Sequence, residues 1–310
     1  MNRIAISATP ELPPARSLRQ IMAMVMLALA PGAMAGVVGF GFSALLQIFL
    51  ALSFALLFEA VMLKLRAQPM IRFLTDFSAP VTAVLFALLI PPSAPWWVAA
   101  IGMGVAIVLA KHCFGGLGRN LFNPAMAGIA AVWLCAPQEF AAMLAPASVS
   151  DGNSTSPLHN FATNGFSGRS HEWLAIAYAL GGIFLLRKKI IPWQTPFATL
   201  TAAALSNFFL MTYASGETSM PLSRAFPEVW ILGAFFVVTD PVTGCISARG
   251  RLLFGAGVGI LGCVIGQWSG PVVGLASAVL LMNCVAPWLD QHFRPGPPPT
   301  ASAAPQDASP

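Results

Sequence analysis

A glycine-rich turn carries the first group of side chains with useful chemistry. The segment Phe114–Ala125 reads F-G-G-L-G-R-N-L-F-N-P-A, so three glycines are followed by Arg119, Asn120 and Asn123. Glycine lets a backbone approach a ligand closely, asparagine offers amide donors and acceptors, and arginine pairs with anions. The segment predicts a binding turn, with a purely structural turn between two helices as the alternative.

A second group surrounds one aspartate at the edge of an apolar run. Residues 235–244 read F-F-V-V-T-D-P-V-T-G, which places Asp240 close to Thr239 and Thr243. An ionisable residue at such a position is costly to bury, so it is a candidate for function. The alternative is a simple ion pair of Asp240 with Arg249 or Arg251.

Two further features have plainer interpretations. Glu59 lies inside an apolar run shortly before Lys64, and we expect its carboxylate to reach the nearby membrane surface. The segment 148–160 is rich in hydroxyls, which are acceptors for group transfer once a catalyst activates them, although by composition it is an ordinary polar loop. The five cysteines and four histidines show no metal-ligand spacing, and no disulfide is expected.

The elements that must hold these residues are membrane helices. Of 310 residues, 57% are hydrophobic and 9% are charged, against roughly a quarter charged in soluble domains. About 20 apolar residues cross a bilayer, so the apolar runs predict an all-α integral membrane protein with about ten transmembrane helices. The runs lie near residues 20–39, 43–63, 78–92, 96–111, 122–145, 173–186, 192–213, 228–243, 252–267 and 270–289.

Basic residues predict the orientation, because cytoplasmic loops of membrane proteins collect lysine and arginine. With the N-terminus inside, 14 of the 16 basic residues fall on one side, and only Arg169 and Arg224 on the other. We therefore expect a multi-pass protein of the bacterial inner membrane with both termini cytoplasmic. The net charge of +5 reflects this topology, so no nucleic-acid partner is expected. A cleaved signal peptide ending at Ala33-Met34-Ala35 is the alternative for the first run.

The chain divides into one membrane domain and two polar ends. Residues 1–18 and 291–310 are predicted to be disordered cytoplasmic segments, and residues 19–290 to form the membrane domain, with an outside loop at about 146–171. Ten helices are consistent with two inverted five-helix repeats. The third run of each half is short and ends at proline, at Pro91 and Pro241, which indicates a site between the halves. Ordinary helix termination by proline explains the same pattern.

Taken in order, these segments resemble the NqrB/RnfD family, which supplies membrane proteins to the sodium-pumping NADH:quinone reductase and to the Rnf electron-transport complex. The resemblance rests on E-A-V-M-L-K-L-R at 59–66, residues 76–97, the G-G-L-G-R-N-L-F-N-P-A-M-A-G turn, L-L-R-K-K-I-I-P-W at 185–193, F-F-V-V-T-D-P-V-T-G and A-V-L-L-M-N at 278–283. It implies a membrane subunit that carries flavin and passes electrons, coupled to sodium or proton translocation, with other Rnf-like subunits as partners.

The resemblance also implies FMN held covalently on the outside loop, through a phosphoester to a threonine that a separate flavin transferase forms from FAD. The family pattern Ser/Thr-Gly-Ala-Thr, often followed by Pro-Leu, is not kept here. Alignment on Pro157-Leu158 places Ser156 at the acceptor position, with Thr155 as the second choice, whereas alignment on Asp151-Gly152 places Pro157 there and abolishes attachment. A second, non-covalent flavin, riboflavin or FMN, is implied, with Asn120, Asn123, Asp240 and Thr243 as its nearest candidates.

Three functions stay open at this point. The first is the flavin subunit of an Rnf-like translocase, which is not catalytic alone. The second is an orphan flavin subunit of another membrane redox chain, suggested by the divergent loop. The third is a flavin-free transporter of a small solute on the same fold.

Overall fold

The computed structural model describes residues 17–70, 74–116, 118–138, 140, 170–215 and 227–293, and the regular structure in these parts is entirely helical. In chain order the helices are α1 (Leu18–Phe40), α2 (Phe42–Leu65), α4 (Ser78–Leu89), α5 (Trp96–Met103) with its π-helical continuation η1 (Gly104–His112), α6 (Pro124–Cys135), α9 (Ser170–Arg187), α10 (Gln194–Ser215), α12 (Glu228–Leu232) with its π-helical continuation η2 (Gly233–Val237), α13 (Ala248–Ser269) and α14 (Pro271–Phe293).

The helices are of two lengths. Among the described residues, α1, α2, α13 and α14 are long and apolar enough to cross a membrane, whereas α4, α5 with η1, α6, and α12 with η2 are shorter apolar helices. The runs near 78–92 and 228–243, which were expected to be short, are confirmed as short. The helices α5 with η1 and α6 are short as well. Crossing by ten helices, and an inverted repeat, remain predictions.

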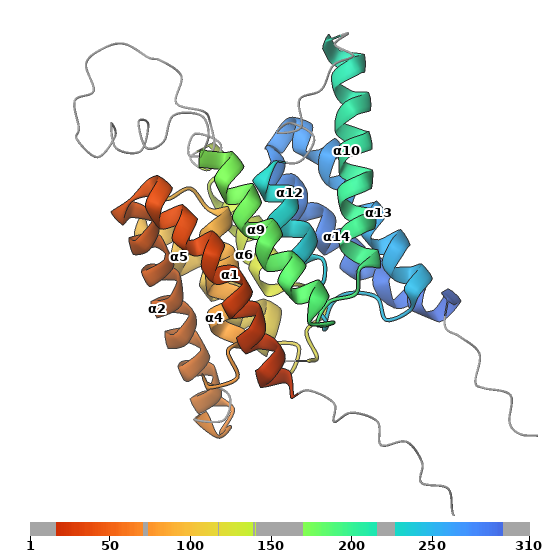
Figure 1. Ribbon diagram of the computed structural model, residues 1–310. Helices are drawn as coiled ribbons and strands as arrows, with labels where there is room; N and C mark the ends of the chain where they lie inside the picture. The colour runs from red at the N-terminus through yellow and green to blue at the C-terminus, as the bar shows by residue number, and fades with distance from the viewer. Residues whose placement is uncertain are drawn as a thin grey trace, which may run out of the picture.

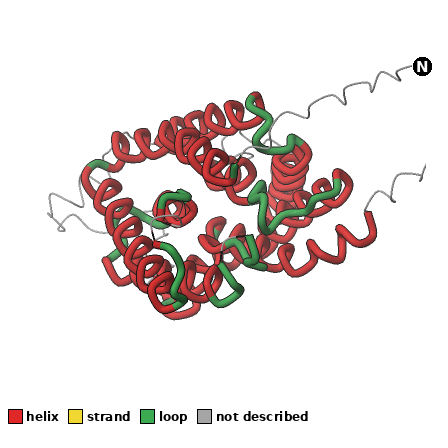
Figure 2. Tube along the Cα trace, turned by 90° about the horizontal axis from the view of Figure 1, so that it is seen from below, coloured by secondary structure: helices red, strands yellow, loops and turns green. Residues whose placement is uncertain are grey.

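The short helices lie inside the bundle. Figure 1 shows α1 and α2 along one flank and α10, α13 and α14 along the other, and Figure 2 shows the helices gathered into one bundle joined by loops. Ten of the twelve residues of α4 are buried, while α1 and α2 expose large apolar side chains such as Val38 and Phe49. A helix of twelve residues is only about 18 Å long, so its ends need protein partners inside a membrane domain.

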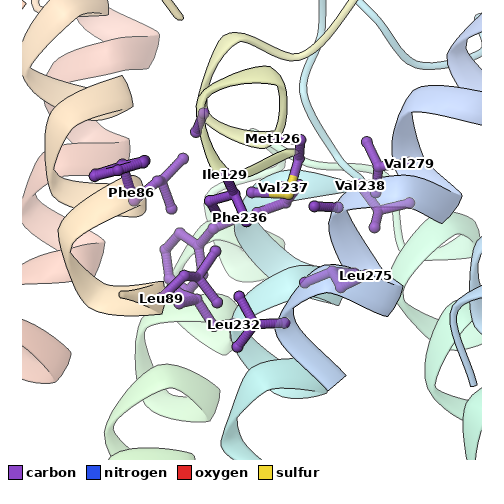
Figure 3. Packing of buried hydrophobic residues seen from close by; sticks show 14 of the residues in the cluster. Phe86, Leu89, Met126, Ile129, Leu232, Phe236, Val237, Val238, Leu275 and Val279 are labelled. Atoms are coloured by element: carbon purple, nitrogen blue, oxygen red, sulfur yellow. The ribbon is translucent and has the colours of Figure 1, made fainter. Parts of the chain in front are cut away.

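The centre of the bundle joins the two halves of the chain. Side chains of α4, α6, α12 with η2, and α14 pack together there, among them Phe86, Met126, Phe236 and Leu275 (Figure 3). All four are at most 5% exposed. The core therefore holds the ends of the short helices of both halves in fixed positions.

Glycines permit a close contact between α13 and α14. A Cβ added at Gly274 on α14 would lie 2.3 Å from the carbonyl oxygen of Gly262 and 2.8 Å from Cα of Gly266, both on α13. Since these are backbone atoms, no side-chain movement can relieve the clash. The pair α13 and α14 depends on this missing side chain.

We expect Gly274→Ala to lower the free energy of unfolding by about 1–3 kcal/mol, because α13 and α14 must separate. Gly36→Ala is the matched control, since a Cβ there meets only ordinary contacts at 3.9 Å and 4.0 Å. Thermal unfolding of the detergent-purified protein measures both. Equal midpoints for the two variants would contradict the packing described here.

Candidate functional site

A cavity of about 70 Å³ lies among the ends of the short helices. Its wall is mostly apolar, with side chains from α1, α4, the end of α9 and η2, and seven polar residues interrupt it. The polar residues are Ser78, Thr82, Lys111, Asn120, Asn123, Thr239 and Asp240. Three of the four residues nominated from the sequence, Asn120, Asn123 and Asp240, thus line one cavity.

Asn123 connects the first half of the chain to the second. Its side chain caps α6 by accepting from the Met126 amide at 3.3 Å, and its backbone amide donates to Oδ1 of Asn283 at 3.0 Å. Its Nδ2 lies 3.4 Å from Oδ2 of Asp240 and 3.5 Å from the Val237 carbonyl oxygen. Hydrogen bonds of Asn123 therefore link the start of α6 to the end of η2 and the residues after it.

Asp240 is held by neutral donors. Oδ1 accepts from the Val242 amide at 3.0 Å, and Oδ2 accepts from the Thr243 hydroxyl at 3.1 Å. Within the described residues Asp240 forms no ion pair with arginine, and Arg251 instead donates to the Cys245 carbonyl at 3.1 Å. The alternative of an Asp240–arginine pair is wrong. Thr243, the fourth nominated residue, does not line the cavity but holds the aspartate that does.

Asn120 presents an unused acceptor. Its Nδ2 donates to the Phe122 carbonyl at 3.1 Å, while its Oδ1 is buried without a partner. A buried polar atom of this kind costs free energy unless something binds to it. Because Asn120 lines the cavity, a ligand with an N–H or O–H donor would satisfy this oxygen.

Glu59 does not reach the membrane surface, and the expectation that it would is wrong. Its side chain is 1% exposed, and both carboxylate oxygens lie 2.8 Å from Nζ of Lys111, which is itself 2% exposed. Nε2 of His112 lies 3.2 Å from Oε2 of the same carboxylate. The Glu59 carboxylate can be buried because Lys111 neutralises its charge, whereas an unpaired carboxylate would be strongly destabilising in the same place.

The π-helix η1 explains how two neighbouring residues reach one carboxylate. The Cys113 amide bonds to the carbonyl of Val108, five residues earlier, at 3.0 Å, and Ala110, Lys111 and His112 are all buried. In a regular α-helix successive side chains diverge by about 100°, so three in a row cannot all face one partner helix. Such widened turns often occur at functional sites.

Arg66 contacts His112 on the ring nitrogen that does not face Glu59. One guanidinium nitrogen lies 3.1 Å from Nδ1 of His112, and the other donates to the Gly115 carbonyl at 3.0 Å. Since arginine can only donate, Nδ1 of His112 is the acceptor, and the ring proton is on Nε2, facing Glu59. Gly115 and Gly116 have φ of +111° and +97°, which bring the turn's backbone under the guanidinium.

Sequence reasoning missed Lys111 and His112. Lys111 was counted with the basic residues of the cytoplasmic loops, but it lies within η1 and is buried. Its partner is 52 positions away, and no local spacing links the two. The usable signal was the presence of one acidic and one basic residue, Glu59 and Lys111, each close to the end of an apolar run.

The predicted covalent acceptors are not part of the described structure. Ser156 and Thr155 lie outside the described residues, as does the segment at about 146–171 apart from residues 170 and 171, which begin α9. Their role stays a prediction. The described part contains no group of three or more His, Cys, Asp or Glu residues arranged to hold a metal ion.

Comparison with known proteins gives a match along almost the whole chain. Residues 5–297 match the NQR2, RnfD, RnfE family. The D subunit of the ion-translocating oxidoreductase complex of Ectopseudomonas mendocina is 41% identical, over 89% of this chain and 90% of its own length. The protein of the same name from Vibrio cholerae is 35% identical, over 94% of this chain and 97% of its own.

We expect Lys111→Met to lower the free energy of unfolding by about 3–5 kcal/mol, because it leaves Glu59 charged and unpaired in the core. The double variant Glu59→Gln, Lys111→Met should regain most of this loss, since glutamine is neutral and has nearly the same shape as glutamate. Thermal unfolding in detergent compares the two. A double variant no more stable than Lys111→Met would show that the pair is not the cause.

Proposed function

The chain belongs to the NQR2, RnfD, RnfE family, and from that membership we propose that it is the flavin-carrying membrane subunit of an Rnf-like ion-motive electron-transport complex. The observation that carries the proposal is the match to D subunits of ion-translocating oxidoreductase complexes along nearly the full length of both chains. In this function the chain lies in the bacterial inner membrane with both termini cytoplasmic. Its partners are the other proteins of the complex and a flavin transferase.

The cavity wall offers polar groups that could form hydrogen bonds with a non-covalent flavin. The unpartnered Oδ1 of Asn120 would accept from a ring N–H, and the hydroxyls of Ser78 and Thr82 lie in the same wall. Pockets for ligands of this size measure roughly 300–1,000 Å³, so the apolar side chains of α1 and α9 must move apart to admit the ring. A bound flavin would supply the redox chemistry, while these residues bind and orient it.

The covalent flavin belongs to the outside loop. A flavin transferase would join the hydroxyl oxygen of Ser156, or of Thr155, to the FMN phosphorus of FAD while the bond between the two phosphates breaks and AMP leaves. Serine offers the same nucleophilic oxygen as threonine. With one flavin outside and one in the cavity, the chain would carry electrons between the two sides of the membrane.

We expect the denatured protein to fluoresce as a flavin in a gel after co-expression with a flavin transferase, because a phosphoester survives denaturation. Ser156→Ala should lose this signal, while Thr155→Ala is the matched control that keeps it. Mass spectrometry of the tryptic fragment after Arg119 locates the FMN. Fluorescence lost only in Thr155→Ala would move the acceptor to that residue, and a wild-type band without flavin would contradict covalent attachment.

The second flavin is tested in the doubly substituted protein Thr155→Ala, Ser156→Ala, where any remaining flavin is non-covalent. Adding Asn120→Ala should weaken flavin retention by up to roughly tenfold, the equivalent of one lost hydrogen bond. The control is Asn207→Ala on α10, a helix that contributes nothing to the cavity wall. Flavin released per protein by acid is the measurement, and equal loss in both variants would contradict a site at Asn120.

A further inference from the structure

Helix α9 ends with a lysine at a backbone position that favours glycine. The Ile190 amide donates to the Leu185 carbonyl at 3.0 Å. The Lys189 amide donates to the Leu186 carbonyl at 2.9 Å, and these two bonds together form a Schellman motif. The motif requires a left-handed residue just after the helix, and Lys189 has φ of +54°. Glycine adopts this conformation without a steric penalty, whereas lysine does not.

The end of α2 shows that the motif itself does not require a charge. The Ala67 amide donates to the Lys64 carbonyl at 3.1 Å, and the Gln68 amide donates to the Leu63 carbonyl at 2.9 Å. Ala67 is the left-handed residue there, with φ of +49°. A small neutral side chain therefore fits the same turn, and the lysine at the end of α9 needs a different explanation.

Three consecutive cations are exposed at this end of α9. Arg187, Lys188 and Lys189 are all exposed to the surroundings of the chain. A cation near a helix C-terminus is favourable, but Arg187 and Lys188 already provide that interaction. Within the described residues, Arg187 and Lys189 form no ion pair. An anion from outside the chain can therefore reach both.

An exposed apolar surface begins directly beside these cations. Trp193, which precedes α10, packs edge-to-face on Phe197 with ring centroids 6.0 Å apart. Phe197, Leu205 and Phe209 follow at intervals of eight and four residues on one side of α10, and each is at least 58% exposed. The opposite side, which includes the buried Thr199, packs on α13. Figure 1 shows α10 at the edge of the bundle.

We propose that the end of α9 and the exposed side of α10 bind one anionic phospholipid. Its phosphate lies against Arg187 and Lys189, and its acyl chains follow Phe197 and Leu205 along α10. Trp193 then lies at the level of the headgroups, where tryptophan is enriched in membrane proteins. Cations next to an apolar helix side favour a lipid over a soluble anion, which would use the cations alone. The inference requires a membrane but no flavin, so it is independent of the proposed redox function.

The test uses the full chain, purified in neutral detergent and stripped of lipid, with thermal unfolding as the measure of binding. Phosphatidylglycerol should raise the wild-type midpoint more than zwitterionic phosphatidylcholine does. Lys189→Gly should need about fivefold more phosphatidylglycerol for half of the effect, as expected for one cation lost at an anionic surface. Without lipid this variant should unfold no earlier than the wild type, because glycine suits a φ of +54°. A damaged fold therefore cannot explain the loss.

Two matched controls separate the backbone from the charge. Ala67→Gly makes the same change of backbone at the end of α2 and leaves every charge in place. Lys64→Gln removes an exposed cation from the end of α2, on the opposite flank of the bundle from α10 (Figure 1). Both variants should respond to phosphatidylglycerol as the wild type does. An equal loss in Lys64→Gln and Lys189→Gly would show a general effect of charge and overturn the site.

The position of the acyl chains is tested by fluorescence. Phosphatidylglycerol with brominated acyl chains should quench the tryptophan emission of the wild type, and Trp193→Phe should lose part of that quenching. Quenching that is equal in both proteins would overturn the placement along α10. Glycerol 3-phosphate that stabilises the protein as well as the lipid does would make the ligand a soluble phosphate. Equal effects of phosphatidylglycerol and phosphatidylcholine would overturn the proposal entirely.

Discussion

A helix that ends inside a membrane domain leaves backbone groups that lipid cannot satisfy, and this constraint shapes the centre of the molecule. The start of α6 and the end of η2 are such ends. Asn123 and Asn283 supply what they lack: Asn283 accepts from the Asn123 amide and donates to the Thr243 carbonyl, while Asn123 caps α6 and reaches Asp240. Two of these residues, Asn123 and Asp240, also line the cavity.

The second requirement is charge balance. Glu59 and Lys111 lie in the same core as Phe86 and Met103, where an unpaired ion would be far more costly than any single hydrogen bond can offset. The π-helix η1 and the partly buried Arg66 arrange the partners so that each charge faces its opposite or a polar group. Removing either Glu59 or Lys111 is therefore expected to cost more than the lost contact, because the other residue is left as an uncompensated buried charge.

The sequence predicted those features that are visible locally. The glycine-rich turn drew attention to Asn123 and the edge of an apolar run to Asp240, and runs that end at proline predicted that α4 and η2 are short. The sequence could not predict the pair of Glu59 with Lys111. Burial of this pair depends on which helices pack against each other, and the spacing of residues along the chain does not indicate that. For the same reason the sequence could not decide between a functional Asp240 and an Asp240–arginine pair, and the structure shows neutral donors from Val242 and Thr243 on this carboxylate.

Charge balance also bears on how a redox group would behave in this cavity. Lys111 is neutralised by Glu59, Asp240 is held only by neutral donors, and the described residues of the cavity wall offer no other cation. An electron added there would meet no uncompensated positive charge, and in a medium of low dielectric constant that is costly.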